Sequence, residues 1–170
     1  MNVWVSFVIP CLNESKTIVD VIKECHEAGK KFKSYEIIIS DNGSKDGSQQ
    51  LAKAIGAKVI NTKKKGYGSA LKNGIKNAKG KYIIMGDADR TYNFNHAYKF
   101  VKLLDNGFDL VIGNRFKGQI QNKAMPPLHF LLGNPVLSAL GRLLFKINIG
   151  DFHCGLRAFK KESVLKLNLK

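Results

Sequence analysis

The chain has 170 residues, about the length of one domain, so it can form a single sizeable hydrophobic core but not two independent ones. Hydrophobic residues make up 44% of the chain and charged residues 24%, a composition that excludes intrinsic disorder. There are 28 lysine and arginine residues against 13 aspartate and glutamate residues, a formal net charge of +15. A chain of this charge attracts nucleic acids, anionic membrane surfaces or phosphorylated small molecules.

Strands and helices are predicted to alternate along the chain. Apolar, β-branched runs indicate strands at residues 3–9, 35–40, 57–61, 81–86 and 108–113. The intervening segments carry apolar residues at helical spacing, beginning with Ile18, Val21, Ile22 and Cys25 in a helix expected at 15–29. The later helices are expected to end at Gly56, Gly80 and Gly107.

This alternation predicts an α/β fold with a parallel sheet covered by helices on both faces, because the strands are nearly all apolar. Ligands of such sheets bind at the carboxyl ends of the strands. The loops at 10–15, 41–48, 87–94 and 114–118 are therefore expected to form the functional site.

Several common sites are excluded by spacing. Gly66, Gly68 and Gly74 do not fit the dinucleotide-binding G-x-G-x-x-G pattern, and no G-K-[ST] or G-x-S-x-G occurs. The four histidines lack metal-binding spacing, and the three cysteines form no C-x-x-C pair, so neither a zinc site nor a disulfide framework is predicted. The start of the chain lacks the features of a signal peptide, and we expect a reducing, cytoplasmic setting.

Carboxylates that follow apolar strands remain as candidates. Asp46 is interpreted as a turn residue, whereas Asp41 fits a turn or a ligand-binding role equally well. Asp87 and Asp89 lie one residue apart, and such carboxylates repel each other unless a cation lies beside them. Mg²⁺ and Mn²⁺ bind carboxylate together with phosphate oxygen, so a metal carrying a diphosphate is one solution; a solvated acidic turn is the other.

Four linked motifs carry a family resemblance: "VIPCLNES" at 8–15, "EIIISDNGSKDGS" at 36–48, "GYGSALKNGIKNAKGKYIIMGDAD" at 66–89 and "DLVIGNRFKG" at 109–118. In order and spacing they resemble family 2 glycosyltransferases of the GT-A fold, whose Rossmann-like sheet is mostly parallel. "GDADRTYNF" and "GDFHCGLRAFKKE" are similar to the polyprenyl-phosphate or dolichyl-phosphate sugar synthase branch.

The resemblance implies a role for particular residues. Asp89 would be the principal metal ligand, with Asp87 and Thr91 beside it, although Thr91 replaces a glutamine found in many relatives. Asp89, Arg115 and Asp151 would be catalytic, Asp151 as an acceptor-positioning residue or base. The residues implied to contact substrates are Pro10, Leu12, Asn13, Glu14, Asp41, Asn42, Gly66, Asp87, Ala88, Asp89, Arg115, Lys117 and Arg157.

The resemblance also implies an activity: metal-assisted, inverting transfer of a hexose from a nucleoside-diphosphate sugar, UDP-linked rather than GDP-mannose. The implied cofactor is Mg²⁺ or Mn²⁺, and the implied acceptor is undecaprenyl or dolichyl phosphate. Such proteins act at the cytoplasmic face of a membrane in building cell-envelope glycans, and oligomers are possible. An inactive sugar-nucleotide-binding domain is the alternative; nucleic-acid binding is less favoured because no recognition module is present.

We expect one domain over residues 1–170, with a nucleotide-binding half at 1–115 and an acceptor or membrane-proximal part at 116–170. The chain stops without a helix-stop signal, which is typical of a fragment, and the full-length protein is expected to be membrane-anchored. No apolar run in this chain is long enough to span a bilayer. A helix at 136–147 gathers apolar residues on one face, either as a core helix or as a helix lying on an anionic membrane, where this fragment would be peripheral.

Overall fold

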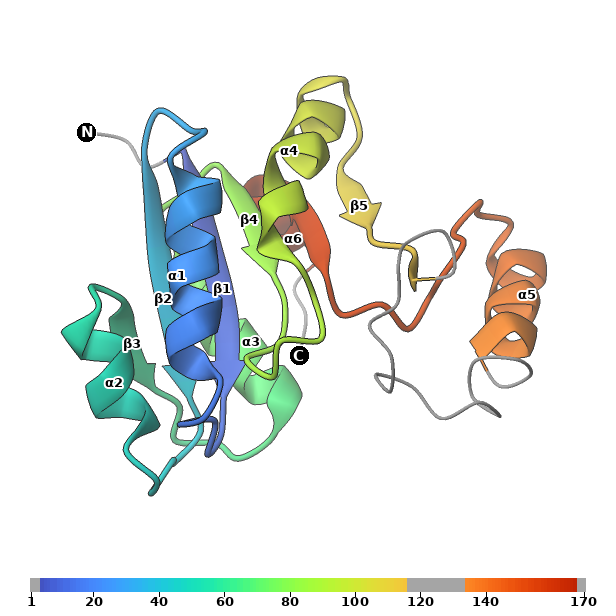
Figure 1. Cartoon of the computed structure of the whole chain (residues 1–170). Coiled ribbons are helices and arrows are strands. Elements are labelled where there is room, and N and C mark those ends of the chain that lie inside the picture. The colour runs from blue at the N-terminus through green and yellow to red at the C-terminus, as the bar shows by residue number, and fades with distance from the viewer. Residues whose placement is uncertain (1–3, 116–133, 168–170) are drawn as a thin grey trace.

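The computed structural model describes residues 4–115 and 134–167 and contains a six-stranded sheet between helices (Figure 1). The strands are β1 Val5–Cys11, β2 Tyr35–Asp41, β3 Lys58–Asn61, β4 Tyr82–Met85, β5 Leu110–Ile112 and β6 Arg157–Lys160. The helices are α1 Ile18–Gly29, α2 Ser48–Ala54, α3 Tyr67–Asn77, the short 3₁₀ helix η1 Phe94–His96, α4 Ala97–Asp105, α5 Asn134–Phe145 and α6 Lys161–Lys166.

The sheet is mixed, with the strand order β3-β2-β1-β4-β6-β5. The four strands β3, β2, β1 and β4 are parallel, as the sequence pattern predicts. β6 runs antiparallel to both of its neighbours, β4 and β5. The sequence analysis missed β6 because its four residues, Arg-Ala-Phe-Lys, are too few and too polar at the ends to show a strand pattern. The sheet is therefore mostly parallel, as expected, with β6 as its antiparallel member.

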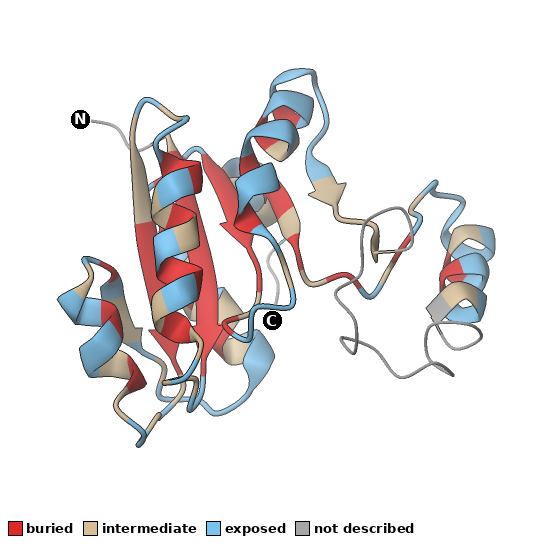
Figure 2. Cartoon of the chain, viewed as in Figure 1, coloured by how far each residue is buried: buried red, intermediate tan, exposed pale blue. Residues whose placement is uncertain are grey.

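Helices cover both faces of the sheet, as expected. On one face the side chains of β1, including Phe7 and Ile9, pack with residues of α1, α2 and α4 in the larger core cluster. On the other face Val8, Ile38 and Ile83 pack against α3 and α6 in a smaller cluster. Figure 2 shows the central strands as the most continuously buried part of the chain.

Residues on both sides of position 115 contribute strands to the sheet. β6 belongs to the second segment, yet it lies between β4 and β5 inside the sheet. α5 is different, because it stands away from the sheet and exposes its apolar side chains (Figures 1 and 2). It buries Ser138 and Gly141 instead, and Gly141 lies against the ring of Phe152. In the described part of the chain, no helix is both long and apolar enough to cross a membrane.

Gly80 marks a place where the chain passes close to the central strand. Its backbone N–H donates to the hydroxyl of Ser6 at 2.8 Å, and a Cβ atom built on it would lie 2.5 Å from the backbone nitrogen of Ser6. A side chain at this position therefore requires a shift of β1 itself.

Gly80→Ala is predicted to lower the free energy of unfolding by about 2 kcal/mol, because overpacking against backbone cannot be relieved by a rotamer change. Gly68→Ala is the matched control: Gly68 lies in α3, and a Cβ atom there meets nothing within 4 Å. The control should be neutral or stabilising by up to about 1 kcal/mol. Denaturant unfolding followed by circular dichroism measures both; equal stability of the two variants would contradict the prediction.

Candidate functional site

The loops after β1 and β2 are joined by hydrogen bonds at the carboxyl edge of the sheet. The backbone N–H of Asn13 donates to the Ser44 hydroxyl at 2.9 Å, and its side-chain oxygen accepts from the backbone of Lys45 at 2.8 Å. The backbone N–H of Glu14 donates to the hydroxyl of Ser48 at 2.9 Å. Asn13 has a φ of 59°, a conformation that asparagine tolerates better than most residues. The two loops therefore form one wall of the site.

Asp41 ends β2 and is almost completely buried, with 1% of its surface exposed. One carboxylate oxygen, Oδ1, accepts hydrogen bonds from the backbone of Gly43 and Ser44 and from the side chain of Gln49, at 2.8–3.0 Å. The other oxygen, Oδ2, is buried and has no hydrogen-bond partner. A buried carboxylate oxygen without a donor is costly, and this atom has the capacity to accept one more hydrogen bond.

Asn42 fixes the loop that leads into α3. Its side-chain amide donates to the carbonyls of Thr62 and Lys64 at 3.2 and 3.0 Å, and its oxygen accepts from the backbone of Gly66 at 2.6 Å. Gly66 has a φ of 119°, which a residue with a side chain rarely adopts. The segment 62–66, called the β3–α3 loop below, is thereby held against the loop that carries Asp41.

Asp87 and Asp89 follow β4 at the same edge. Asp87 is half-buried and accepts a hydrogen bond from the Tyr67 hydroxyl at 2.7 Å, whereas Asp89 is exposed and accepts from the backbone of Thr91 at 2.9 Å. Burial raises the pKa of Asp87, and the negative charge of Asp89 raises it further. The mutual repulsion expected from the sequence is therefore present.

The donor set fits a hard divalent cation. Asp87 and Asp89 are close enough to repel each other, the charge of Arg157 offsets this only in part because the pKa of Asp87 stays raised, and hard cations bind carboxylate oxygen. Among the described residues there is no cluster of three or more histidine, cysteine or acidic side chains that could hold a metal ion. Asp87 and Asp89 would therefore share the cation with water and with oxygens of a phosphorylated ligand, which suits Mg²⁺ or Mn²⁺.

Tyr92 connects the Asp87–Asp89 loop to the loop before β6. Its hydroxyl accepts a hydrogen bond from the backbone of Gly155 at 2.8 Å. A Cβ atom on Gly155 would lie 2.9 Å from a carboxylate oxygen of Asp87 and equally close to the Tyr92 ring, so a side chain here would displace one of these two groups. Arg157 reaches the same cluster, and its charge lowers the pKa of Asp87 in opposition to burial.

Arg115 and Asp151 form a buried ion pair. The Arg115 Nε and Nη2 atoms donate to the two oxygens of Asp151 at 2.7 and 2.9 Å, and the backbone N–H of His153 donates to the same carboxylate at 3.1 Å. Asp151 is fully buried, which raises its pKa, but the hydrogen bonds from Arg115 outweigh burial and leave the pKa below its usual value. Asp151 is therefore arranged to position Arg115, and this geometry does not suit it to the role of base that the sequence analysis allowed.

Most of the residues expected at the site lie on neighbouring loops at this edge. Asp46 is a turn residue as interpreted, since it accepts from the backbone of Ser48 at 3.1 Å. Arg157 donates hydrogen bonds to the carbonyls of Phe152 and Cys154, so part of its role is to hold the loop before β6 in shape. Lys117 lies outside the described residues. The roles of the others stay predictions; they are Pro10 and Ala88, both buried, and Leu12, Asn13, Glu14 and Gly66, which are partly or fully exposed.

Sequence reasoning missed several residues that organise the site. Tyr67 and Tyr92 contact the Asp87 loop, and Ser44, Ser48 and Gln49 support the Asp41 loop. A signal was available for the tyrosines, because Tyr67 lies between two glycines of one motif and Tyr92 lies within "GDADRTYNF".

Asp151→Asn is predicted to destabilise the fold by about 2 to 3 kcal/mol, because it leaves the partly buried Arg115 without a counter-charge. The lowered pKa of Asp151 means that its stabilising effect is present above the ordinary aspartate pKa and is lost as the pH falls below it. The free energy of unfolding, measured at several pH values from 7 to 3, should therefore depend less on pH in the variant than in the unchanged chain.

Asp109→Asn is the matched control, because Asp109 pairs with Lys160 at 3.1 Å on the surface. Its stability should change little. Equal losses in the two variants would show that the Arg115–Asp151 pair has no special structural role.

Comparison with known proteins identifies the family. The chain matches the family described as Glycosyl transferase family 2 over residues 6–167. The low-salt glycan biosynthesis hexosyltransferase Agl6 of Haloferax volcanii is 35% identical over 160 residues, which are 93% of this chain and 38% of that protein. The dolichyl-phosphate hexose transferase of the same organism is 30% identical over 126 residues, 74% of this chain and 54% of that protein. The chain thus spans about half the length of these relatives.

Solved structures show the same architecture. Glucosyl-3-phosphoglycerate synthase from Mycobacterium tuberculosis, in complex with Mn²⁺, UDP-glucose and phosphoglyceric acid, superposes with a TM-score of 0.72 at 25% identity. The match covers 94% of this chain and 57% of that one. The chain therefore belongs to glycosyl transferase family 2 and has the GT-A fold.

Proposed function

We propose that this chain is the donor-binding and catalytic domain of a hexosyltransferase that uses a UDP-linked sugar. The observation that carries the proposal is the buried, unpaired Oδ2 atom of Asp41, which lies on the same sheet edge as Asp87 and Asp89. The imide N–H of uracil is a donor of the kind that this oxygen lacks. The carboxylates at the end of β4 then suit a divalent cation that carries the diphosphate. The synthase complex with Mn²⁺ and UDP-glucose supports this choice of donor and metal class.

The proposed reaction is a displacement at the anomeric carbon of the sugar. An acceptor oxygen forms the new bond to that carbon while the bond to the donor diphosphate breaks, its electron pair leaving with the diphosphate and the configuration inverting. When bound, the divalent cation supplies charge neutralisation for the leaving group. Arg115 is positioned by Asp151, and two of its five N–H donors hold that carboxylate. The remaining donors are available for a phosphate oxygen of donor or acceptor.

A polyprenyl phosphate is the acceptor that we favour. The dolichyl-phosphate hexose transferase among the relatives supports this class. A phosphate monoester is largely ionised at neutral pH, since its second pKa is about 6, so the reaction does not need a strong general base. The engagement of Asp151 with Arg115 agrees with a mechanism of that kind.

α5 is the element that we assign to the membrane surface. Its apolar residues are exposed on the described chain, Leu143 by 75% and Leu144 by 65%, while Arg142 and Lys146 lie beside them. A helix with exposed leucines next to basic residues fits the interface of an anionic bilayer. The core-helix interpretation of this segment loses support, because its buried residues, Ser138 and Gly141, are small.

Asp89→Asn is predicted to remove the Mn²⁺-dependent part of the thermal stabilisation by UDP-glucose and to abolish sugar transfer, because one of two metal-binding carboxylates is lost. Asp41→Asn should weaken UDP binding with or without metal, since an amide in the wrong orientation offers a donor where an acceptor is needed. Thermal-shift measurements with UDP-glucose and GDP-mannose, each with and without Mn²⁺, check both variants.

Glu27→Gln is the control for the donor-site variants, because Glu27 forms an exposed ion pair with Lys30 on α1. It should behave as the unchanged chain does. Retention of the full Mn²⁺-dependent shift by Asp89→Asn would contradict the metal assignment. Metal-dependent UDP-glucose binding without transfer to any phosphate acceptor would favour a sugar-nucleotide-binding domain instead.

The double variant Leu143→Gln and Leu144→Gln is predicted to reduce binding to vesicles that contain anionic phospholipid, because it removes apolar area from the exposed face of α5. Leu103→Gln with Leu165→Gln removes two exposed leucines from α4 and α6 and serves as the control. Co-sedimentation with vesicles measures both. An equal loss in the two double variants would argue against a specific role for α5.

A further inference from the structure

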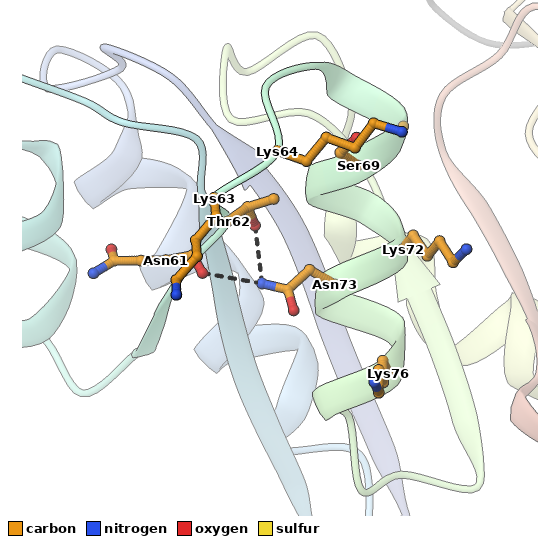
Figure 3. Close-up of a pocket in the computed structure, with 9 residues that line it drawn as sticks. Asn61, Thr62, Lys63, Lys64, Ser69, Lys72, Asn73 and Lys76 are labelled. Atoms are coloured by element: carbon orange, nitrogen blue, oxygen red, sulfur yellow. Dashed lines mark hydrogen bonds between the residues drawn. The ribbon is translucent and has the colours of Figure 1, made fainter. Parts of the chain in front are cut away.

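A second hollow lies outside the donor site, between the β3–α3 loop and the side of α3. Its volume is about 510 Å³, and Figure 3 shows Asn73 of α3 reaching toward Asn61 and Thr62 across it. We call it the β3–α3 groove; its lining residues are Asn61, Thr62, Lys63, Lys64, Gly68, Ser69, Lys72, Asn73 and Lys76. None of the carboxylates assigned to the donor site lines it. Its volume is in the range of small-molecule sites.

The groove is strongly basic. Lys63 and Lys64 come from the loop and Lys72 and Lys76 from α3, and no acidic residue lines the groove. Within the described residues, none of these four lysines forms an ion pair with a carboxylate. Four like charges around one hollow repel each other, and an anion placed among them relieves that repulsion.

Hydrogen bonds hold the walls of the groove in place. The side-chain amide of Asn73 donates to the carbonyl of Asn61 at 3.3 Å and to the hydroxyl of Thr62 at 2.9 Å. The Thr62 hydroxyl also lies 2.9 Å from that of Ser40, a buried residue of β2. On its other side the loop is held by Asn42, which binds the carbonyls of Thr62 and Lys64. The backbone that carries Lys63 and Lys64 is therefore fixed relative to α3 before any ligand arrives.

We propose that the β3–α3 groove is an anion-binding site for a phosphate group, separate from the donor site. Lysine ammonium groups bind phosphate as point charges, and the hydroxyl of Ser69 adds a hydrogen-bond donor to the lining. The phosphate can belong to a soluble phosphorylated molecule or to a phospholipid headgroup. A nucleic acid fits less well, because no aromatic side chain lines the groove to stack on a base.

The test compares Lys72→Gln with Lys76→Gln, as a double variant, against Lys99→Gln with Lys102→Gln on α4. Both pairs lie on exposed helical positions, and both double variants lose two charges. The probe is inorganic pyrophosphate in metal-free buffer, followed by ¹⁵N amide chemical shifts. We expect shifts at Lys63, Lys64, Gly68 and Ser69, and affinity about tenfold weaker in the groove variant but nearly unchanged in the control.

Vesicles distinguish the source of the phosphate. If the groove variant weakens binding both to pyrophosphate and to phosphatidylglycerol vesicles, the groove binds headgroup phosphate; if it weakens only pyrophosphate binding, the ligand is soluble. Either result supports the site. Equal affinities of the two double variants for pyrophosphate, or shifts confined to Gly43 and Ser44 of the donor site, would overturn the proposal. A gain of affinity for single-stranded RNA over pyrophosphate that depends on the same lysines would also overturn it in favour of nucleic-acid binding.

Discussion

β1 pairs in parallel with β2 on one side and with β4 on the other, and the rest of the molecule depends on this arrangement. Parallel neighbours end at the same edge, so the register that places Cys11 beside Asp41 also brings the loop after β4 to that edge. The residues after these three strands are far apart in sequence but share one surface. Burial of the strands on both faces keeps that register fixed, because a one-residue slip would move the side chains that fill one core into the other, where they do not fit.

The second constraint is electrostatic. The chain has a net charge of +15, and the carboxylates of the candidate site differ in how their negative charge is compensated. Asp151 is neutralised by Arg115, and Asp41 accepts hydrogen bonds through one oxygen only. Asp87 and Asp89 repel each other, and the charge of Arg157 only partly offsets that repulsion. The acidic edge is therefore electrostatically incomplete, and this is the property expected of a surface that receives a metal and a diphosphate together. The groove beside α3 has the opposite imbalance, because four lysines and no acidic residue line it.

The parallel core could be predicted from the sequence because its strands are long apolar runs that alternate with periodic helices. β6 could not, since its position depends on pairing with β4 and not on its own pattern. The sequence favoured a turn role and a ligand role for Asp41 equally. In the structure one of its oxygens accepts hydrogen bonds within the turn, while the other has no partner. Arg115 and Asp151 were each expected at the site, but their pairing across 36 positions leaves no trace in local spacing.

The antiparallel insertion of β6 also has a consequence for the order of folding. β4 cannot complete its pairing, and β5 has no neighbour in the described sheet, until the ribosome has released Arg157–Lys160. During synthesis the nascent chain therefore presents an unpaired edge on β4 for as long as the intervening residues are being added. Pairing of β4 with β6 and formation of the Arg115–Asp151 pair both require residues after position 150, so Arg115 gains its counter-charge at the same late stage as β4 gains its second neighbour.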